Sequence, residues 1–253
     1  MSILYDMRSG ELVKSRLYSN NLLLKDSLEF NPLSLFKDDK QGVWYDPSDK
    51  STMFQDVAGT VPVTKDGDPV ALMKDKSGNG NHATQTMSAA RPTYRTDGIL
   101  HWLQADGVDD RLASGVIDIP QPYSRFSAWL LSDVTSDNRL LGGFQSQVWR
   151  FNGRLAVYYG GGVVVTTASV LVGIPFVFTE KVNGPSTYIA VNKDGNTVGG
   201  GSRDMQNLTL FTRSTDACGE GRFFGVLVCS GVLDATSTEN IQEYFAKKAG
   251  VTL

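Results

Sequence analysis

From residue 42 onward, short hydrophobic runs alternate with polar turns rich in Gly, Asn, Asp and Pro. Such runs, recurring roughly every 8 to 12 residues, are typical of all-β folds. Val, Ile, Thr and aromatic residues, which suit a half-buried pleated surface, fill most of them. The pattern therefore predicts a body made mainly of strands, at 100–106, 125–132, 139–144, 147–151, 154–159, 162–168, 175–182, 186–192, 207–212 and 223–230.

The turns between these runs predict antiparallel hairpins. Asn152-Gly153 separates two aromatic-rich runs by two residues, the pattern of a type I′ turn, whose central residues both need positive φ. Residues 147–159 are therefore predicted to form one hairpin. Asn183-Gly184 offers similar chemistry for the next pair of runs, and Asp194-Gly195 is predicted to mark the connection after it.

One helix is predicted near the C-terminus, over 237–249. Thr236 and Glu239 have the spacing of a capping box at its start. A shared hydrophobic face, two basic residues in the last turn and a glycine stop complete the pattern, formed by Ile241, Tyr244, Phe245, Lys247, Lys248 and Gly250.

Residues 1–40 differ from the rest because their leucines follow neither a strand nor a helix period. Such a segment needs another surface on which to bury these side chains. We expect an arm that docks on the body or on a neighbouring subunit, with a simple extension as the alternative. The predicted division is an arm at 1–40 and a body at 41–253.

Charge and composition limit the classes of partner that the protein is expected to bind. The formal net charge is −3, and the chain has no run of Lys or Arg of the kind that grips phosphate backbones, so we expect no nucleic-acid partner. No window approaches the 18 or so apolar residues that span a bilayer, and the N-terminus lacks a signal pattern. We expect assembly in the cytoplasm and no membrane partner. Two cysteines, Cys218 and Cys229, are too few for a disulfide framework.

Three stretches resemble a known family. They are Gly42-Val-Trp-Tyr-Asp-Pro-Ser-Asp-Lys; Asp75-Lys-Ser-Gly-Asn-Gly-Asn-His with Asp106-Gly-Val-Asp-Asp-Arg-Leu; and the ending that runs from Gly225 into the predicted helix. Together they resemble the LamG-like, concanavalin A-like jelly-roll domains of phage virion proteins, over residues 42–253. The resemblance implies an all-β, two-sheet antiparallel sandwich, a place in a virion, and carbohydrate recognition as a frequent property of relatives.

The candidate sugar-binding surface is the hairpin 147–159, since sugar rings present both C–H patches and hydroxyls to aromatic and amide groups. Its candidate residues are Trp149, Asn152, Tyr158 and Tyr159. Adjacent residues of a strand point to opposite faces, so one of the two tyrosines is expected in the core.

Oxygen ligands suited to calcium are frequent in two turns, although no EF-hand spacing is present. The candidate calcium ligands are Asp75, Asn79, Asp106 and Asp109, with Asn81 and Asp110 nearby. Solvated turn carboxylates are the alternative. No cofactor is expected to be required.

No catalytic residues are predicted. No predicted strand carries the two carboxyl groups that a glycanase needs, and neither histidine, His82 or His101, lies in a pattern typical of a catalytic triad. We therefore expect a non-enzymatic virion structural protein, in a tail, a fibre or a capsid decoration, that displays a lectin-like sandwich. Its expected partners are other virion proteins through 1–40, further copies of itself, and host-surface carbohydrate. The alternatives are a dedicated carbohydrate-binding receptor module or a polysaccharide depolymerase.

Overall fold

The computed structural model describes residues 30–132, 139–143, 146–158, 162–201, 204–211 and 218–253, together with the short strands β1 (Ile3–Tyr5) and β2 (Leu12–Lys14). The chain divides into two compact units, Met1–Asn31 and Pro32–Leu253. In the first unit β1 pairs antiparallel with β2. The second unit begins with the 3-10 helix η1 (Pro32–Phe36), whose Phe36 is buried and lies against Gly42. The compact body thus starts before residue 41.

The body is a sandwich of two antiparallel sheets. In order, the first sheet contains β17 (Asp194–Val198), β16 (Thr187–Val191), β15 (Phe176–Val182), β10 (Tyr123–Leu131), β19 (Glu220–Ser230), β8 (His101–Asp106) and β7 (Thr93–Thr96), with β3 (Gly42–Tyr45) paired to the second half of β19.

The second sheet contains β14 (Val163–Ser169), β13 (Arg154–Tyr158), β12 (Gln147–Phe151), β11 (Arg139–Gly142), β18 (Thr209–Leu210), β9 (Leu112–Ser114), β6 (Ala83–Thr84), β5 (Leu72–Met73) and β4 (Met53–Phe54). Short 3-10 helices η2 (Lys50–Thr52), η3 (Ser88–Ala90) and η4 (Gly184–Ser186) lie in the connections. The predicted all-β sandwich with one C-terminal helix is confirmed.

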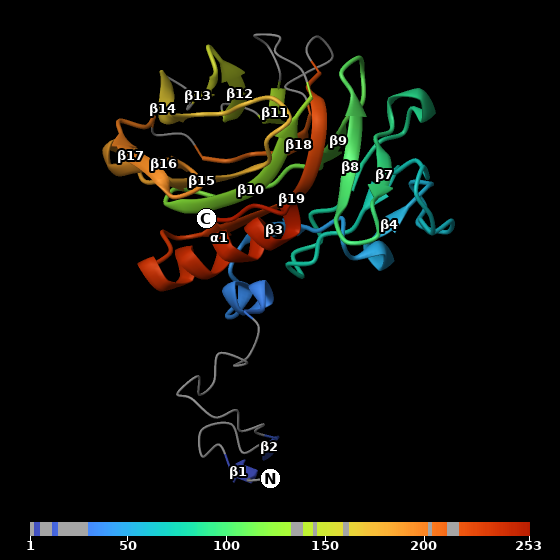
Figure 1. Cartoon of the computed structure of the whole chain (residues 1–253), viewed down its shortest axis with the longest axis horizontal. Helices are drawn as coiled ribbons and strands as arrows, with labels where there is room; N and C mark the ends of the chain where they lie inside the picture. Colours follow the sequence, from blue (N-terminus) through green and yellow to red (C-terminus); the bar gives the residue numbers. More distant parts are fainter. Residues whose placement is uncertain are drawn as a thin grey trace. The chain divides into compact units, whose positions relative to one another are not determined.

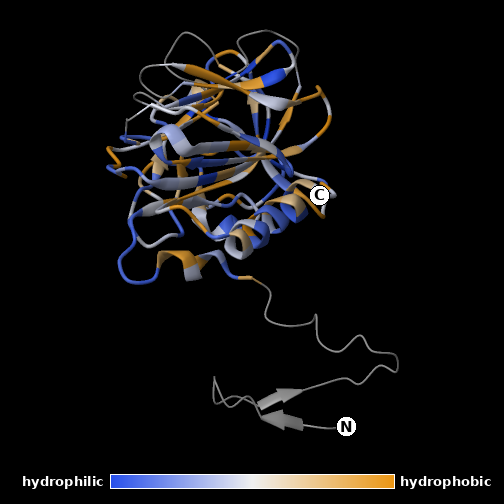
Figure 2. Ribbon diagram, turned by 90° about the vertical axis from the view of Figure 1, so that its left-hand side faces the viewer, coloured by the Kyte–Doolittle hydropathy of each residue, from blue (hydrophilic) through white to orange (hydrophobic). Residues whose placement is uncertain are grey.

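The core lies between the two sheets. Trp129 of β10 and Phe223 of β19 have ring centroids 4.9 Å apart, and Phe211 packs edge-on against Trp129 at 5.5 Å. Tilted and edge-on pairs of this kind add to the burial of large apolar rings. Figure 2 shows hydrophobic positions interspersed with hydrophilic ones along the strands. The central strands β10, β15 and β19 of the first sheet are buried over almost their whole length.

The three predicted turns have different outcomes. Asn152 (φ 49°) and Gly153 (φ 76°) connect β12 to β13, which confirms the hairpin. At the second turn the chain instead enters η4. The third prediction is wrong, because Asp194-Gly195 lies inside β17 and the turn falls at Asn192, which itself adopts φ 55°. Asparagine tolerates the left-handed region without a glycine after it.

Helix α1 (Ala235–Ala249) covers the outer face of the first sheet, against β10, β15 and β19 (Figure 1). The predicted capping box is wrong: Asp234 is the N-cap and accepts a hydrogen bond from Ser237 N at 2.7 Å. The predicted stop at Gly250 is confirmed by its φ of 70°. Ile241 and Phe245 are buried as expected.

The layers of the body are therefore second sheet, first sheet and helix, with β11–β14 on the side away from α1 (Figure 1). No helix among the described residues has the length and hydrophobicity to cross a membrane.

Candidate functional site

The hairpin β12–β13 presents aromatic side chains on the outer face of the second sheet. Residues directly opposite each other in an antiparallel pair share a face. Val148 pairs with Val157, and both are buried in the core. Trp149, which pairs with Ala156, therefore lies on the outer face.

The neighbouring pairs extend this outer surface. Tyr158 pairs with Gln147 on one side of Trp149, and Phe151 pairs with Arg154 on the other. Phe151 is 46% exposed, whereas Trp149 and Tyr158 are half-buried. We call this surface the aromatic face, formed by Arg139, Gln147, Trp149, Phe151, Arg154, Tyr158, Val163 and Val165.

The flanking strands contribute a cation and two valines to the aromatic face. Arg139 of β11 pairs with Trp149, and its guanidinium carbon lies 4.9 Å from the ring centroid, a cation–π contact. On β14, Val165 pairs with Ala156 and Val163 pairs with Tyr158. Val163 is 54% exposed. The face is thus a mixed aromatic, aliphatic and basic surface on the side of the sandwich away from α1.

Three of the four predicted sugar-binding residues gather here. Trp149 and Tyr158 are on the aromatic face, and Asn152 is exposed in the adjoining turn. Tyr159 lies outside the described residues. Phe151, Arg139 and Arg154 were not predicted, although the pairing that follows from the Asn152-Gly153 turn places Phe151 and Arg154 opposite each other.

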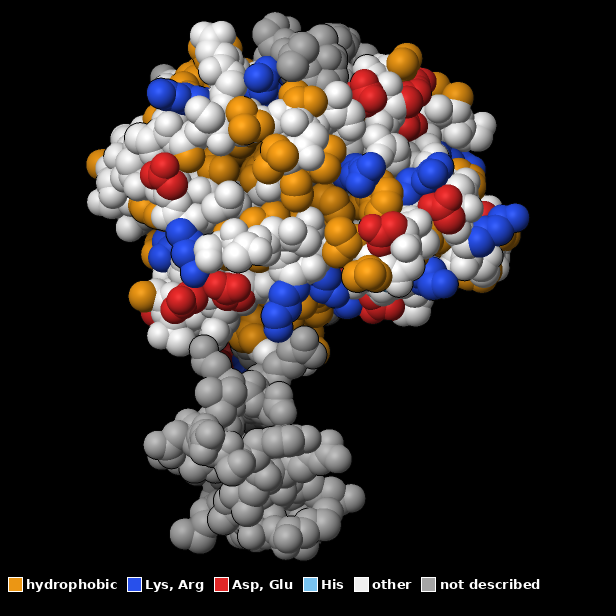
Figure 3. All heavy atoms as spheres, viewed as in Figure 1, with side chains coloured by type: hydrophobic (Ala, Val, Ile, Leu, Met, Phe, Trp, Pro, Cys, Tyr) orange, Lys and Arg blue, Asp and Glu red, His pale blue; other side chains and the backbone are white. Residues whose placement is uncertain are grey.

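A second cluster joins two of the predicted calcium ligands. Asp106 and Asp109 lie with Asp110, and one carboxylate oxygen of each lies within 4.8 Å of the others. The pKa of Asp110 is raised to about 6, first by burial and then by the charges of Asp106 and Asp109, which together outweigh a backbone hydrogen bond from Asp106. In Figure 3 acidic side chains gather over this β8–β9 region.

The other two predicted ligands serve a different turn. Asp75 accepts hydrogen bonds from Trp44 N at 2.9 Å, from Ser77 N and Oγ at 2.8 and 2.7 Å, and from Asn81 N at 3.0 Å. Asn79 donates to Ser77 Oγ and to a backbone carbonyl. The Asp75 carboxylate therefore closes a turn and is not part of the aspartate cluster.

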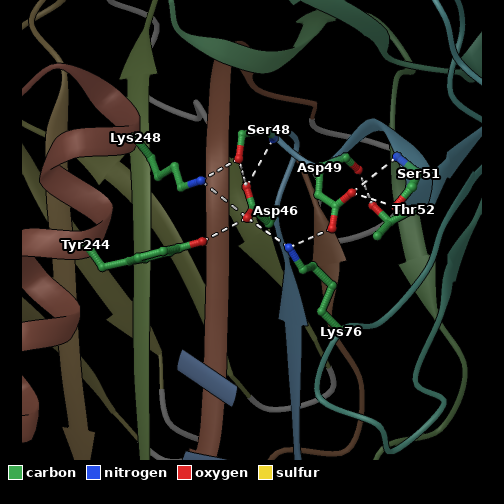
Figure 4. Close-up of polar contacts among 8 residues, drawn as sticks. All are labelled: Asp46, Ser48, Asp49, Ser51, Thr52, Lys76, Tyr244 and Lys248. Carbon is green, nitrogen blue, oxygen red and sulfur yellow. Dashed lines mark hydrogen bonds and ion pairs between the residues drawn. The ribbon is translucent and has the colours of Figure 1, made fainter. Parts of the chain in front are cut away.

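A third cluster of polar side chains, centred on Asp46, joins the segment after β3 to the C-terminal helix α1 (Figure 4). Asp46, 3% exposed, accepts hydrogen bonds from Ser48 Oγ at 2.6 Å, Tyr244 Oη at 2.8 Å and Lys76 Nζ at 3.2 Å, and pairs with Lys248 Nζ at 3.4 Å. Burial alone would raise the pKa of Asp46, but the two lysines and the hydrogen bonds outweigh it and lower the pKa. Its oxygens are saturated, so the group fastens α1 to the sandwich.

The groups that could support hydrolysis are engaged elsewhere or lie apart from the aromatic face. Glu180, at the centre of β15, forms a buried ion pair with Arg125. His82 Nδ1 accepts from Asp75 N at 3.1 Å, and His101 Nδ1 is hydrogen-bonded to Tyr94 Oη. Glu220 pairs across strands with Asp106, a juxtaposition of two carboxylates that inspection of single strands does not reveal.

Comparison with solved structures finds a similar fold in parts of three other proteins. Domain 4 of AbnA, an extracellular GH43 arabinanase from Geobacillus stearothermophilus solved with arabinotriose, superposes with a TM-score of 0.55 at 10% identity, over 80% of this chain and 98% of that one. An arabinofuranosidase solved with a substituted xylobiose gives 0.53 at 12% identity, over 72% and 51%. Trypanosoma rangeli sialidase gives 0.50 at 11% identity, over 82% and 37%.

The chain thus spans about half or less of the arabinofuranosidase and the sialidase. No protein-family profile and no curated protein sequence matches it. At these identities the likeness concerns the fold, and nothing in it points to a phage. The chain is a two-sheet antiparallel β-sandwich, distantly similar in structure to domains of glycoside hydrolases.

Proposed function

We propose that the protein is a carbohydrate-binding module whose binding surface is the aromatic face. The observation that carries the proposal is the row of Trp149, Phe151 and Tyr158 on the sheet face away from α1, the α-helix that the structure describes. The domain of AbnA that shares the fold was solved with arabinotriose, which supports an oligosaccharide as the class of ligand.

The chemistry of the face suits a sugar chain. Aromatic rings pack against the C–H patches of a pyranose or furanose, and amide and guanidinium groups donate to its hydroxyls. Asn152, which is exposed, adjoins Phe151 and supplies an amide group beside the ring, whereas Gln147 beside Tyr158 is buried.

Affinity electrophoresis in gels that contain a neutral or an acidic polysaccharide tests the proposal. At least one polymer, from a panel of arabinan, xylan, alginate, hyaluronate and polygalacturonate, should retard the protein. Trp149→Ala and Tyr158→Ala should remove most of the retardation, since stacking on one aromatic ring contributes about 1–3 kcal/mol in comparable ring-stacking systems. Tyr188→Ala is the matched control, because Tyr188 is also half-buried but pairs with Lys181 on the helix side of the first sheet.

Retardation that survives both aromatic substitutions would place the binding surface elsewhere, and absence of retardation by every polymer would contradict the function itself. We propose further that binding occurs without cleavage. Incubation with the retarding polymer should release no reducing ends. If reducing ends are released, and Glu220→Gln abolishes their release, hydrolysis would instead be assigned to the Asp106–Glu220 pair.

The proposed setting is a virion, with the sandwich displayed for attachment to host-surface glycans and residues 1–40 as the contact to other virion proteins. This setting is supported by the sequence resemblance over residues 42–253. A receptor module outside a virion would use the same aromatic face, so the two settings differ in the role of the N-terminal unit.

A further inference from the structure

The described strands that form the aromatic face carry arginines but no carboxylate, in a chain that is acidic overall. The whole chain has a formal net charge of −3. The described residues of β11–β14 and their turns, 139–143, 146–158 and 162–169, contain three arginines, Arg139, Arg150 and Arg154, and no aspartate or glutamate. In Figure 3 basic side chains lie over β12–β14, whereas acidic side chains gather over the β8–β9 region.

Two of the arginines share the face with the aromatic rings. Arg139 stacks on Trp149, and Arg154 stands opposite Phe151. Arg154 is exposed, and its guanidinium makes no ion pair or side-chain hydrogen bond with any residue that the structure describes. Arg150 alternates with Trp149 along β12 and therefore points to the other side of the strand, near Gly153 at the hairpin end.

Carboxylates near these strands lie at their margin. Asp194 of β17 is the acceptor for Thr167 Oγ1, at 3.4 Å, at the far end of β14. Arg139 lines a cavity together with Glu220, whereas Arg154 pairs across strands with Phe151 and Ser169, neither of which is acidic. A neutral sugar gains no ion pair at this face, whereas an anionic sugar gains one from Arg154.

We propose that the aromatic face is selective for acidic polysaccharides, in which a carboxylate-bearing residue alternates with, or follows, a sugar stacked on the rings. This deepens the proposed function and rests on it. Arg154 would bind a sugar carboxylate through its planar fork of N–H donors, which matches carboxylate geometry better than a lysine would.

The test compares each acidic polymer with its own neutral form. Alginate, hyaluronate and polygalacturonate are used as such and after reduction of their carboxyl groups to alcohols, which keeps the backbone and removes the charge. Dissociation constants are measured by calorimetric titration for the full-length protein and for Arg154→Gln and Arg95→Gln. Arg95 is the control, because it is an exposed arginine on β7, paired with Asp66 and away from the face.

At least one acidic polymer should bind about tenfold tighter than its reduced form, the effect of one charge-assisted hydrogen bond. Arg154→Gln should lower the affinity for the acidic polymer about tenfold and leave the affinity for the reduced polymer unchanged. Added salt should likewise weaken binding of the acidic polymer to the wild type, because it screens the ion pair. Arg95→Gln should change neither.

Equal affinity for acidic and reduced forms, both lost in Trp149→Ala, would overturn the charge selectivity and leave the proposed function standing. Binding of single-stranded DNA in preference to every carboxylate polymer would overturn it in favour of a phosphate ligand. No binding to any polymer, acidic or neutral, would contradict both the selectivity and the proposed function.

Discussion

Asp110 is a carboxylate held where its charge is unfavourable. It is 6% exposed and stands beside Asp106 and Asp109, and its pKa is raised to about 6 from an ordinary value of 3.8. Between these two pH values the folded protein binds the proton more tightly than the unfolded chain. Stability therefore falls as pH rises through this window, and the ionised carboxylate destabilises the fold at neutral pH.

Asp110→Asn should for this reason raise the Tm at pH 7, measured by calorimetry in EDTA, and should raise it less as the pH approaches 4. Asparagine keeps an acceptor for Asp106 N, to which Asp110 is bonded at 3.1 Å. Calcium, which remains a prediction for this cluster, would relieve the same repulsion, so its addition should raise the Tm of the wild type more than that of the variant.

Asp118→Asn is the matched control, because Asp118 is an exposed aspartate outside the cluster. A lower Tm in Asp110→Asn at neutral pH would show that the carboxylate stabilises the turn instead. An equal Tm with calcium and with EDTA would remove the case for a calcium site.

At the residue scale the sequence predicted the aromatic face in part. Trp149 and Tyr158 follow from one hairpin, because the Asn152-Gly153 turn sets its register. Arg139 could not be predicted, since a bulge between Arg139 and Leu141 shifts the pairing of β11 with β12 and defeats counting by alternate residues. All three members of the aspartate cluster were named from the sequence, but Asp75, predicted with them, is used by a separate turn.

At the scale of elements, α1 is attached to the first sheet by apolar and polar contacts together. Phe245, 1% exposed, lies against Gly225 of β19, whose φ of 149° few side-chain-bearing residues adopt. Gln242 Nε2 donates to Thr179 Oγ1 of β15 at 3.0 Å, and Tyr244 donates to Asp46. The hydrophobic stripe of the sequence predicted the buried face, but not that Tyr244 would meet a carboxylate 198 residues away in the chain.

Phe245→Ala should lower the free energy of unfolding by about 3–5 kcal/mol, because it leaves a cavity between helix and sheet. Urea denaturation followed by circular dichroism measures the loss. The exposed Glu243, which pairs with Lys193 at 3.0 Å, supplies the control: Glu243→Ala should cost about 1 kcal/mol or less. A change near zero in Phe245→Ala would mean that the helix is built to meet another surface.

At the scale of the whole molecule, the sequence predicted two parts and an all-β body. The boundary could not be fixed from leucine spacing, because Phe36 belongs to the body through its contact with Gly42, a tertiary contact that leaves no local signal. The fold was predictable because turns, strands and helix signals agree along most of the body.

The proposed contact between the N-terminal region and other virion proteins is tested by two truncations. A chain that starts at Pro32 should keep the Tm and the polysaccharide affinity of the full protein, yet fail to incorporate into assembling virions. A chain that starts at residue 41 should in addition lose stability, because it lacks Phe36. Normal incorporation of the shorter chains, measured by their content in purified particles, would show that the N-terminal region is not the contact.

The claim that the aromatic face binds glycan is tested most directly by acrylamide quenching of tryptophan fluorescence. Trp44, Trp102 and Trp129 are 6%, 7% and 2% exposed, which leaves half-buried Trp149 as the most accessible of the four indoles. Saturation with the best-binding polysaccharide of the panel should lower the quenching constant of the wild type and leave that of Trp149→Phe unchanged. Quenching of the wild type that stays the same while the polysaccharide is bound would contradict the assignment of this face.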